Sequence, residues 1–163
     1  MNVFLDTNAL VKLYHNEKGA DALDNFLNEH EIFHISISEI AIVEFHSAFM
    51  RKLRLKEIEI KNLQSLFGIF DKNIKDFNII ETNKSVIELS VRLIDKYSPT
   101  YILNTLDSIH LSSALISNQI IPVSHFITSD IKLIEVANKF LKYIILTNNI
   151  DLLFNITYKG LKL

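Results

Sequence analysis

Two acidic residues of this sequence directly follow short apolar runs. Asp6 follows the run at residues 3–5, and Asp130 follows the run at residues 126–128 apart from Ser129. Each acid alone suits a helix N-cap, where a carboxylate accepts hydrogen bonds from backbone amides. Both runs, however, predict parallel strands, and open α/β sheets bind ligands in the crevice outside the carboxyl ends of their strands. We therefore expect both acids at one functional edge.

Two further acids lie on predicted helices. Glu44 falls on the apolar stripe that includes Ala41 and Ala48, where a core residue is expected. Burial of an ionised carboxylate is costly unless it is paired or binds a cation; alternatively, the stripe is shifted and Glu44 lies at its solvated margin. Asp107 lies in the first turn of a helix, where the dipole favours a negative charge. It also continues a stripe through His110, which we interpret as a half-buried structural histidine outside the site.

Together the four acids predict a centre for a hard divalent cation. Carboxylate oxygens are the preferred ligands of Mg²⁺ and Mn²⁺, and magnesium also bridges to substrate phosphates. Such ions polarise a phosphodiester and lower the pKa of an attacking water. The sequence contains no Cys, and it has neither the P-loop nor the G-x-G-x-x-G pattern. The chemistry predicted is metal-assisted phosphodiester hydrolysis.

The elements that must position these acids alternate between strand and helix, which indicates an α/β fold with a central, mostly parallel sheet. Strands are predicted at residues 3–5, 32–37, 77–80, 126–128 and 143–146. Helices are predicted at residues 9–14, 20–27, 57–71, 85–97, 105–117 and 131–141. A further helix, ending near residue 53, is predicted to open with a capping box from Ser36 to Glu39.

Length and composition predict one domain at residues 1–147, with a tail at 148–163 of unassigned structure packed on it. No apolar run approaches the roughly 20 residues that span a bilayer, and the first residues do not form a secretory signal. We therefore expect a cytoplasmic protein with no membrane contact. The formal net charge is −2, whereas proteins that bind nucleic acid electrostatically are usually basic.

A cluster of four basic residues offers one answer to this acidic balance. The cluster either binds nucleic acid or is a solvated helix end, where the helix dipole stabilises positive charges. Its members are Arg51, Lys52, Arg54 and Lys56.

The segment from His30 to His34 matches H-E-x-x-H, the pattern of zinc proteases. That chemistry requires a helix, but apolar residues alternate with polar ones from Phe33 onward, which predicts a strand. In a strand the two imidazoles would lie roughly 13 Å apart, too far to share one zinc ion. We interpret the segment as a helix end running into a strand.

Four segments that contain the acids resemble the PIN-domain family, and within it the VapC-like toxins of toxin–antitoxin pairs. They are VFLDTNAL at residues 3–10, SEIAIVE at 38–44, LDSIHLSSA at 106–114 and FITSD at 126–130. The resemblance implies a Rossmann-like sheet and cleavage of single-stranded RNA with Mg²⁺ or Mn²⁺. It also implies a homodimer, silenced by a small antitoxin protein whose tail enters the acidic groove.

Site residues carry over from this resemblance position by position. The family's acidic metal ligands match Asp6, Glu44, Asp107 and Asp130. Its polar neighbours, which orient the carboxylates or the metal-bound water, match Thr7, Asn8, Thr128 and Ser129. Many relatives carry a basic residue just before the third segment, where this chain has Asn104 and Thr105, so we expect no basic contact with a substrate phosphate there.

Three functions remain open on the sequence alone. The leading hypothesis is a metal-dependent endoribonuclease. The acidic net charge favours, as an alternative, a catalytically silent PIN-fold module that binds RNA or protein. A phosphotransfer or phosphatase domain is the third; such domains place two acids close together after the first strand, whereas Asp6 is followed by Thr7 and Asn8.

Overall fold

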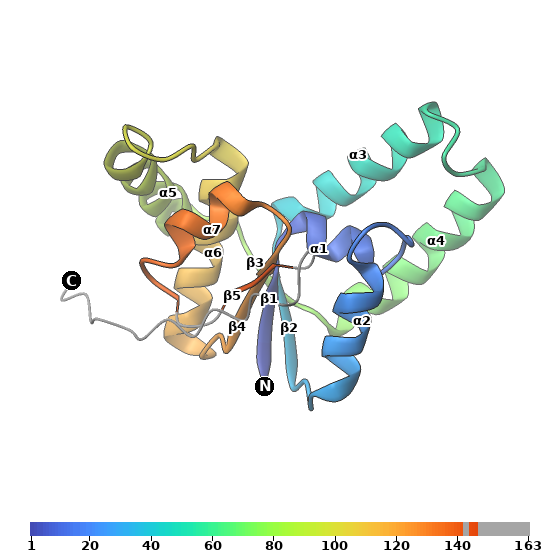
Figure 1. The fold of residues 1–163 in the computed structure, drawn as a ribbon, viewed down its shortest axis with the longest axis horizontal. Coiled ribbons are helices and arrows are strands. Elements are labelled where there is room, and N and C mark those ends of the chain that lie inside the picture. Colours follow the sequence, from blue (N-terminus) through green and yellow to red (C-terminus); the bar gives the residue numbers. More distant parts are fainter. Residues whose placement is uncertain (142–143, 147–163) are drawn as a thin grey trace.

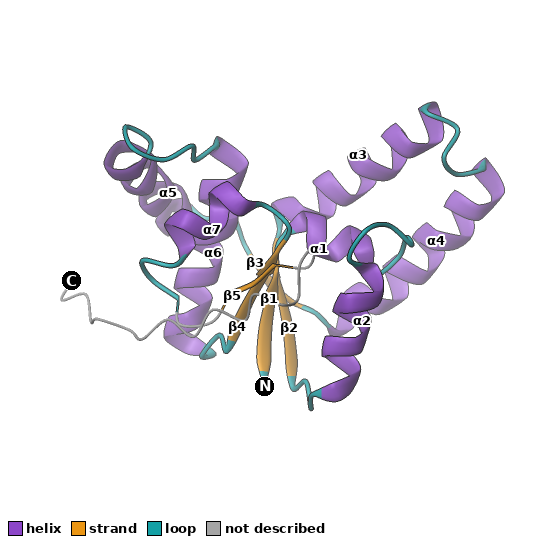
Figure 2. Ribbon diagram, viewed as in Figure 1, coloured by secondary structure: helices purple, strands orange, loops and turns teal. Residues whose placement is uncertain are grey.

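The computed structural model describes residues 1–141 and 144–146. Their strands form a five-stranded sheet in the order β3-β2-β1-β4-β5, and every neighbouring pair is parallel. The strands are β1 (Asn2–Leu5), β2 (His34–Ser38), β3 (Asn78–Ile80), β4 (His125–Thr128) and β5 (Ile144–Leu146). The predicted α/β class, with a Rossmann-like parallel sheet, is confirmed (Figure 2).

Helices connect the strands and cover both faces of the sheet (Figure 1). They are α1 (Thr7–Lys12), α2 (Ala20–Glu29), α3 (Ile40–Arg54), α4 (Ile60–Asn73), α5 (Lys84–Tyr97), α6 (Thr105–Ile120) and α7 (Ile131–Ala137), with a short 3-10 turn, η1 (Ile74–Asp76). Parallel strands require such crossover connections, because a tight hairpin can join only antiparallel strands.

The alternation of side chains along β1 divides the core into two clusters. Val3 and Leu5 point to the face covered by α1 to α4, where they pack in one buried cluster. Phe4 points to the opposite face and stacks on Phe126 with ring centroids 5.7 Å apart, within the cluster that α5, α6 and α7 cover. This period of two is the geometry of a strand buried on both faces.

The order of the strands creates a topological switch point between β1 and β4. From β1 the chain moves outward to β2 and β3, and then returns to the other side of β1 to form β4 and β5. Asp6 immediately follows β1 at this point, and its backbone N–H donates to the Ile127 carbonyl at 3.0 Å. In open α/β sheets this crevice is where ligands bind.

The predicted capping box at the start of α3 is wrong. β2 extends through Ser38, so Ser36 lies within the strand, where its hydroxyl accepts a hydrogen bond from Asn78 at 3.1 Å. Glu39 is the N-cap residue, and its side chain accepts from the Thr82 amide at 3.0 Å instead of capping the helix. Pairing with β3 on the sheet therefore outweighs the local capping pattern.

Helix α7 also ends earlier than predicted. It stops at Ala137, because the amides of Lys139 and Phe140 turn back to carbonyls three residues earlier, which tightens the chain into turns. The predicted strand at residues 143–146 is present as β5, although residue 143 lies outside the described residues. The predicted tail at 148–163 also lies outside them.

The H-E-x-x-H segment is a helix end running into a strand, as predicted. α2 ends at Glu29, His30 is its C-cap, and His34 begins β2. Within the described residues, no helix is both long and apolar enough to cross a membrane.

Candidate active site

Three of the four predicted acids line one cleft of 610 Å³ at the carboxyl edge of the sheet. Asp6 comes from the end of β1, Glu44 from α3 and Asp107 from the first turn of α6. Asp130, at the end of β4, is outside the lining of this cleft but close enough to Asp107 for its charge to raise the pKa of that residue. The structure thus brings together acids separated by more than a hundred positions in sequence.

Asp6 is held rigidly at the base of the cleft. It is the N-cap of α1 and only 3% exposed. One carboxylate oxygen accepts from the Thr7 amide at 2.7 Å, and the other accepts from the Asn8 side chain at 2.6 Å and the Thr128 hydroxyl at 2.7 Å. Burial nevertheless raises the pKa of Asp6, because removal from water outweighs these hydrogen bonds and the nearby His110.

Asn8 ties the ends of β1 and β4 together. Its amide nitrogen contacts Asp6 and Thr128, and its carbonyl oxygen accepts from the Ser129 backbone amide at 2.6 Å. Thr128 also accepts from the Asp130 amide at 3.0 Å. Asn8 and Thr128 therefore contact Asp6 directly, whereas the backbone amide of Ser129 donates to Asn8.

Glu44 is fixed from two sides. One oxygen accepts from the Thr7 hydroxyl at 2.5 Å and contacts His110 Nε2 at 2.6 Å. Burial raises the pKa of Glu44, but the hydrogen bonds from His110 and Thr7 outweigh this effect and lower it below its ordinary value. Its side chain is 23% exposed, so an ionised carboxylate faces the cleft.

His110 is a site residue that the sequence interpretation left out. It is 1% exposed, and its Nδ1 and Nε2 contact Ser38 at 2.6 Å and Glu44 at 2.6 Å. Its Nε2 also lies 3.6 Å from Asp6. Burial lowers the pKa of His110, but the adjacent acids raise it by more, so the pKa lies above its ordinary value. The available signal was the spacing of three from Asp107, which places both residues on one helix face.

Asp107 and Asp130 complete the acidic edge. Asp107 accepts hydrogen bonds from the Asn104 backbone and side chain at 3.3 and 3.0 Å. Burial raises the pKa of Asp107, and the negative charges of Asp130 and Asp6 raise it further. Asp130 is the N-cap of α7 and accepts from the Lys132 amide at 2.7 Å. The cap engages only Oδ1 of Asp130, because the Leu133 amide donates to the same oxygen at 3.3 Å.

The donor set suits a hard divalent cation, although its arrangement is open. Among the described residues, no three acidic or imidazole side chains are placed to surround one ion. Magnesium is usually held by one or two carboxylates and keeps several waters, so this spacing fits it better than a closed protein cage. Asp6 and Asp107 are the best candidates, because both carry raised pKa values that a cation would relieve.

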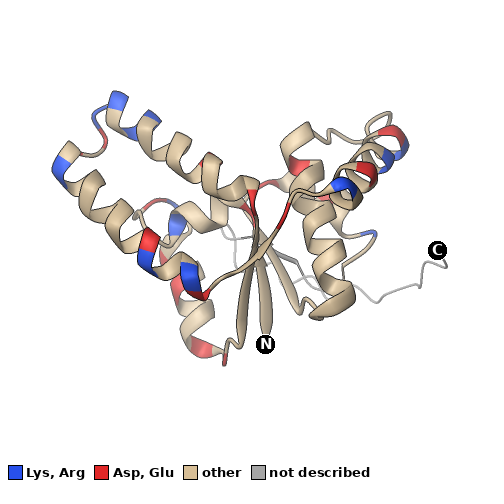
Figure 3. Ribbon diagram, turned by 180° about the vertical axis from the view of Figure 1, so that it is seen from behind, with Lys and Arg blue, Asp and Glu red and all other residues tan. Residues whose placement is uncertain are grey.

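The cleft continues along α3 to a basic end. Arg51, Lys52 and Arg54 line it there, close to the turn that joins α3 to α4. In Figure 3, blue gathers at this turn, and red marks the upper ends of the central strands. Glu17 also lines the cleft, and it bonds Lys52 at 2.9 Å. The helix dipole stabilises basic residues at a helix C-terminus, and here these residues also line the cleft.

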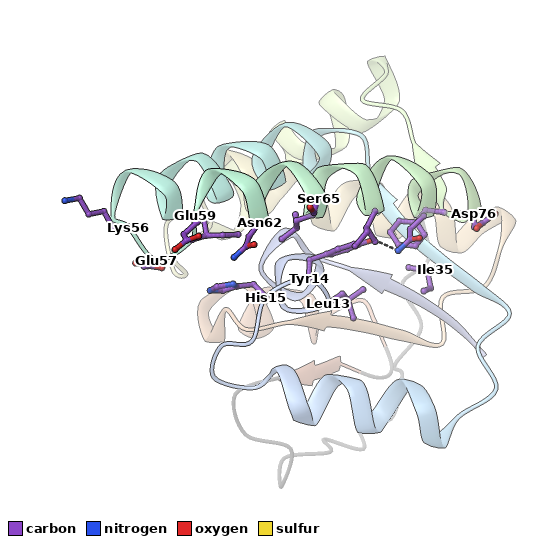
Figure 4. A pocket seen from close by; sticks show the side chains of 15 residues that line it. Leu13, Tyr14, His15, Ile35, Lys56, Glu57, Glu59, Asn62, Ser65 and Asp76 are labelled. Carbon is purple, nitrogen blue, oxygen red and sulfur yellow. Dashed lines mark hydrogen bonds between the residues drawn. The ribbon is translucent and has the colours of Figure 1, made fainter.

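A second, larger hollow of 1020 Å³ lies between α4 and the segment after α1 (Figure 4). Lys56, Glu57 and Glu59 lie at one end of this groove and Asp76 at the other (Figure 4). At its middle, the Tyr14 hydroxyl accepts a hydrogen bond from Asn73 at 3.2 Å. Its carboxylates lie at two opposite ends, so the groove lacks the convergence of the acidic cleft.

A parallel α/β sheet with an acidic cleft at its switch point defines the class of this protein. The chain belongs to the PIN domain family, whose model matches residues 3–139. No curated protein matches it.

Three solved structures are similar in fold. The crystal structure of VapBC2 from Rickettsia felis bound to a DNA fragment from their promoter contains a chain with 21% identity and a TM-score of 0.57, covering 83% of this chain and 93% of that chain. A chain of a toxin–antitoxin complex from Klebsiella pneumoniae has 23% identity and a TM-score of 0.50, and the match covers 81% of this chain and 89% of that chain. A chain of FitAcB from Neisseria gonorrhoeae has 13% identity and a TM-score of 0.62, and the match covers 83% of this chain and 93% of that chain.

Proposed function

We propose that this protein is a metal-dependent endoribonuclease and the toxin of a toxin–antitoxin pair. The observation that carries the proposal is the convergence of Asp6, Glu44 and Asp107 on one cleft at the switch point of a PIN-domain sheet. Asp6 is buried and Asp107 is half-buried, and burial raises the pKa of both, so their ionised forms are costly without a cation. This cost is consistent with a site whose function requires one.

The residues of the cleft have separable tasks in this proposal. Asp6 and Asp107 would hold Mg²⁺ or Mn²⁺, with Glu44 and Asp130 as neighbouring acids. The bound cation would supply the positive charge that polarises the phosphodiester and lowers the pKa of the attacking water. Asn8 and Thr128 orient Asp6, while Thr7 and His110 orient Glu44. Such fixed geometry reduces the reorganisation required during the reaction.

The test is incubation of the purified protein with total cellular RNA, with and without Mg²⁺ or Mn²⁺, followed by mapping of the cut ends. We expect cleavage at defined positions that requires the metal and disappears in Asp6→Asn. Equal cleavage by wild type and Asp6→Asn would contradict the proposal. Retention of RNA without cleavage, across metals and substrates, would favour a silent binding module of the same fold.

An antitoxin partner and a homodimer belong to the same proposal. The fold shared with a chain of a toxin–antitoxin complex from Klebsiella pneumoniae supports the antitoxin partner. The homodimer rests on the sequence resemblance to VapC-like toxins alone. Co-expression with the product of a short reading frame beside the gene is expected to yield a complex that no longer cleaves RNA. Light scattering of the purified chain is expected to give twice its mass of 18.8 kDa; a monomer would contradict the homodimer.

A further inference from the structure

One wall of the acidic cleft is a continuous face of α3. Glu44, Ala48, Arg51 and Leu55 line the cleft in succession, at spacings of four, three and four residues. Such spacings keep side chains on one side of a helix. With a rise of 1.5 Å per residue, the backbone of Arg51 lies about 10 Å along the helix from that of Glu44. A ligand that follows this wall would run from the acids to the arginines.

The three cations of this end differ in whether their charge is already paired. Lys52 Nζ lies 2.9 Å from Glu17 and 3.5 Å from Glu57, and its side chain is only 16% exposed. Arg51 and Arg54 are both exposed, and among the described residues neither forms an ion pair. The charge of Lys52 therefore holds the α1–α2 connection against α3, while the two guanidinium groups remain available to a ligand.

We propose that Arg51 and Arg54 form a phosphate-binding site for the RNA backbone beside the scissile bond, an inference that rests on the proposed function. A guanidinium group presents paired donors that match a phosphate bidentately. A strand whose scissile phosphate lies at the acids carries further phosphates along its length, so one of them would reach the arginines along α3. This site would supply the backbone contact that Asn104 and Thr105 do not offer.

The charge pattern of the cleft favours a nucleic-acid strand over an acidic peptide. A ligand that spans the cleft must meet a carboxylate-rich end and an arginine-rich end. A phosphodiester chain is suited to both, because one phosphate can be bridged by a cation held at the acids while another pairs with the arginines. A peptide carboxylate can satisfy the arginines, but this pairing alone gives the acidic end no role.

Lys56 provides a matched control within the same basic cluster. It is exposed and lies two residues after Arg54, but it lines the larger groove between α4 and α1 instead of the acidic cleft. Loss of its charge alters the net charge of the protein by the same amount as loss of either arginine. A general electrostatic attraction would therefore treat all three positions alike, whereas a local phosphate site would not.

The experiment is fluorescence anisotropy with a labelled single-stranded RNA and the full chain, in Ca²⁺ and separately in EDTA, over a range of salt. We expect Arg51→Gln and Arg54→Gln each to weaken binding by about threefold to tenfold, and each to reduce the slope of log K against log salt by about 0.7. Lys56→Gln is expected to bind as the wild type does. Replacement of single phosphates by neutral methylphosphonates should weaken wild-type binding at one position and have no effect there in Arg51→Gln.

Equal binding by all three variants and the wild type would overturn this inference, as would an equal loss in all three. Arginine-dependent binding of polyglutamate without arginine-dependent binding of RNA would also overturn it, because the ligand would then be a protein. These results are distinct from failure of the proposed function. Arginine-dependent RNA binding without any cleavage would support the phosphate site and contradict the nuclease alone.

Discussion

Two hollows among the described residues differ in size and in chemistry, and the smaller of these two carries the candidate active site. The groove between α4 and the segment after α1 measures 1020 Å³, and its carboxylates lie at its two opposite ends (Figure 4). The cleft at the carboxyl edge measures 610 Å³, yet Asp6, Glu44, Asp107 and a buried histidine converge at one end of it, and basic residues line the other end. The comparison teaches that convergence of charged groups, not volume, distinguishes the candidate site of this molecule.

The difference follows from the direction of the strands. All neighbouring strands are parallel, so the residues that leave β1 and β4 meet at one edge. Helix N-termini also gather there, and Asp6, Asp107 and Asp130 occupy the N-cap or first turn of α1, α6 and α7. The larger groove lies along the side of α4, where no such convergence is built.

The largest expected effect is a loss of RNA cleavage when a carboxylate of the acidic cleft is replaced, with no loss when a carboxylate of the larger groove is replaced. Because charge stabilisation by a metal ion is worth several kcal/mol, Asp6→Asn and Asp107→Asn are each expected to slow RNA cleavage by more than about 10²-fold. Glu59→Gln, which removes an exposed carboxylate from the larger groove, is expected to leave the rate unchanged. Initial rates on one labelled RNA measure all three; a comparable loss in Glu59→Gln would abolish the distinction.

A smaller, pH-dependent effect is expected at His110. Its pKa is raised in the folded protein, despite burial, by Glu44 and Asp6. The stabilisation from its protonated form is therefore fully present below the ordinary value of 6.5 and is lost as the pH rises through the raised pKa.

Urea unfolding of wild type and His110→Gln across this range measures the effect. The difference in unfolding free energy should be largest at low pH and should shrink as the pH increases. Ser38→Ala, which removes the other partner of the ring, serves as a variant that keeps the imidazole. A difference that is independent of pH would mean that His110 acts only through packing.

The smallest expected effect is a gain in stability. Burial and the charges of Asp130 and Asp6 raise the pKa of Asp107, so its ionised form destabilises the fold at neutral pH. Asp107→Asn keeps an oxygen for Asn104 and is expected to raise the melting temperature by about 2–4 °C, as about 1 kcal/mol does in a chain of this size. The gain should decrease as the pH falls through the raised pKa; a lower melting temperature at pH 7 would contradict it.

Much of the fold could be predicted from the sequence, because the strands are short apolar runs between clear helical patterns. The exceptions share a cause. Ser36 and Glu39 form a capping pattern by their spacing, but partners from β3 and the segment after it engage both side chains. Such long-range pairing is invisible to a local pattern.

Part of the candidate site could also be predicted from the sequence. Asp6 and Asp130 could be placed at one edge, because parallel strands bring their carboxyl ends together. The sequence did not reveal that His110 binds both Ser38 and Glu44, since this depends on how α6 meets β2 and α3. Nor did it reveal that Lys52 is paired while Arg51 and Arg54 are not, because Glu17 comes from a distant connection.

The most direct test is a titration of the protein with Mn²⁺. Calorimetry, or the loss of the electron spin resonance signal of free Mn²⁺, measures the affinity and the stoichiometry of binding. The wild type and Glu59→Gln are expected to bind Mn²⁺ with the same affinity, whereas Asp107→Asn should bind at least about tenfold more weakly. Equal binding by the wild type and Asp107→Asn, or no binding by the wild type, would contradict a cation site at the carboxyl edge of the sheet.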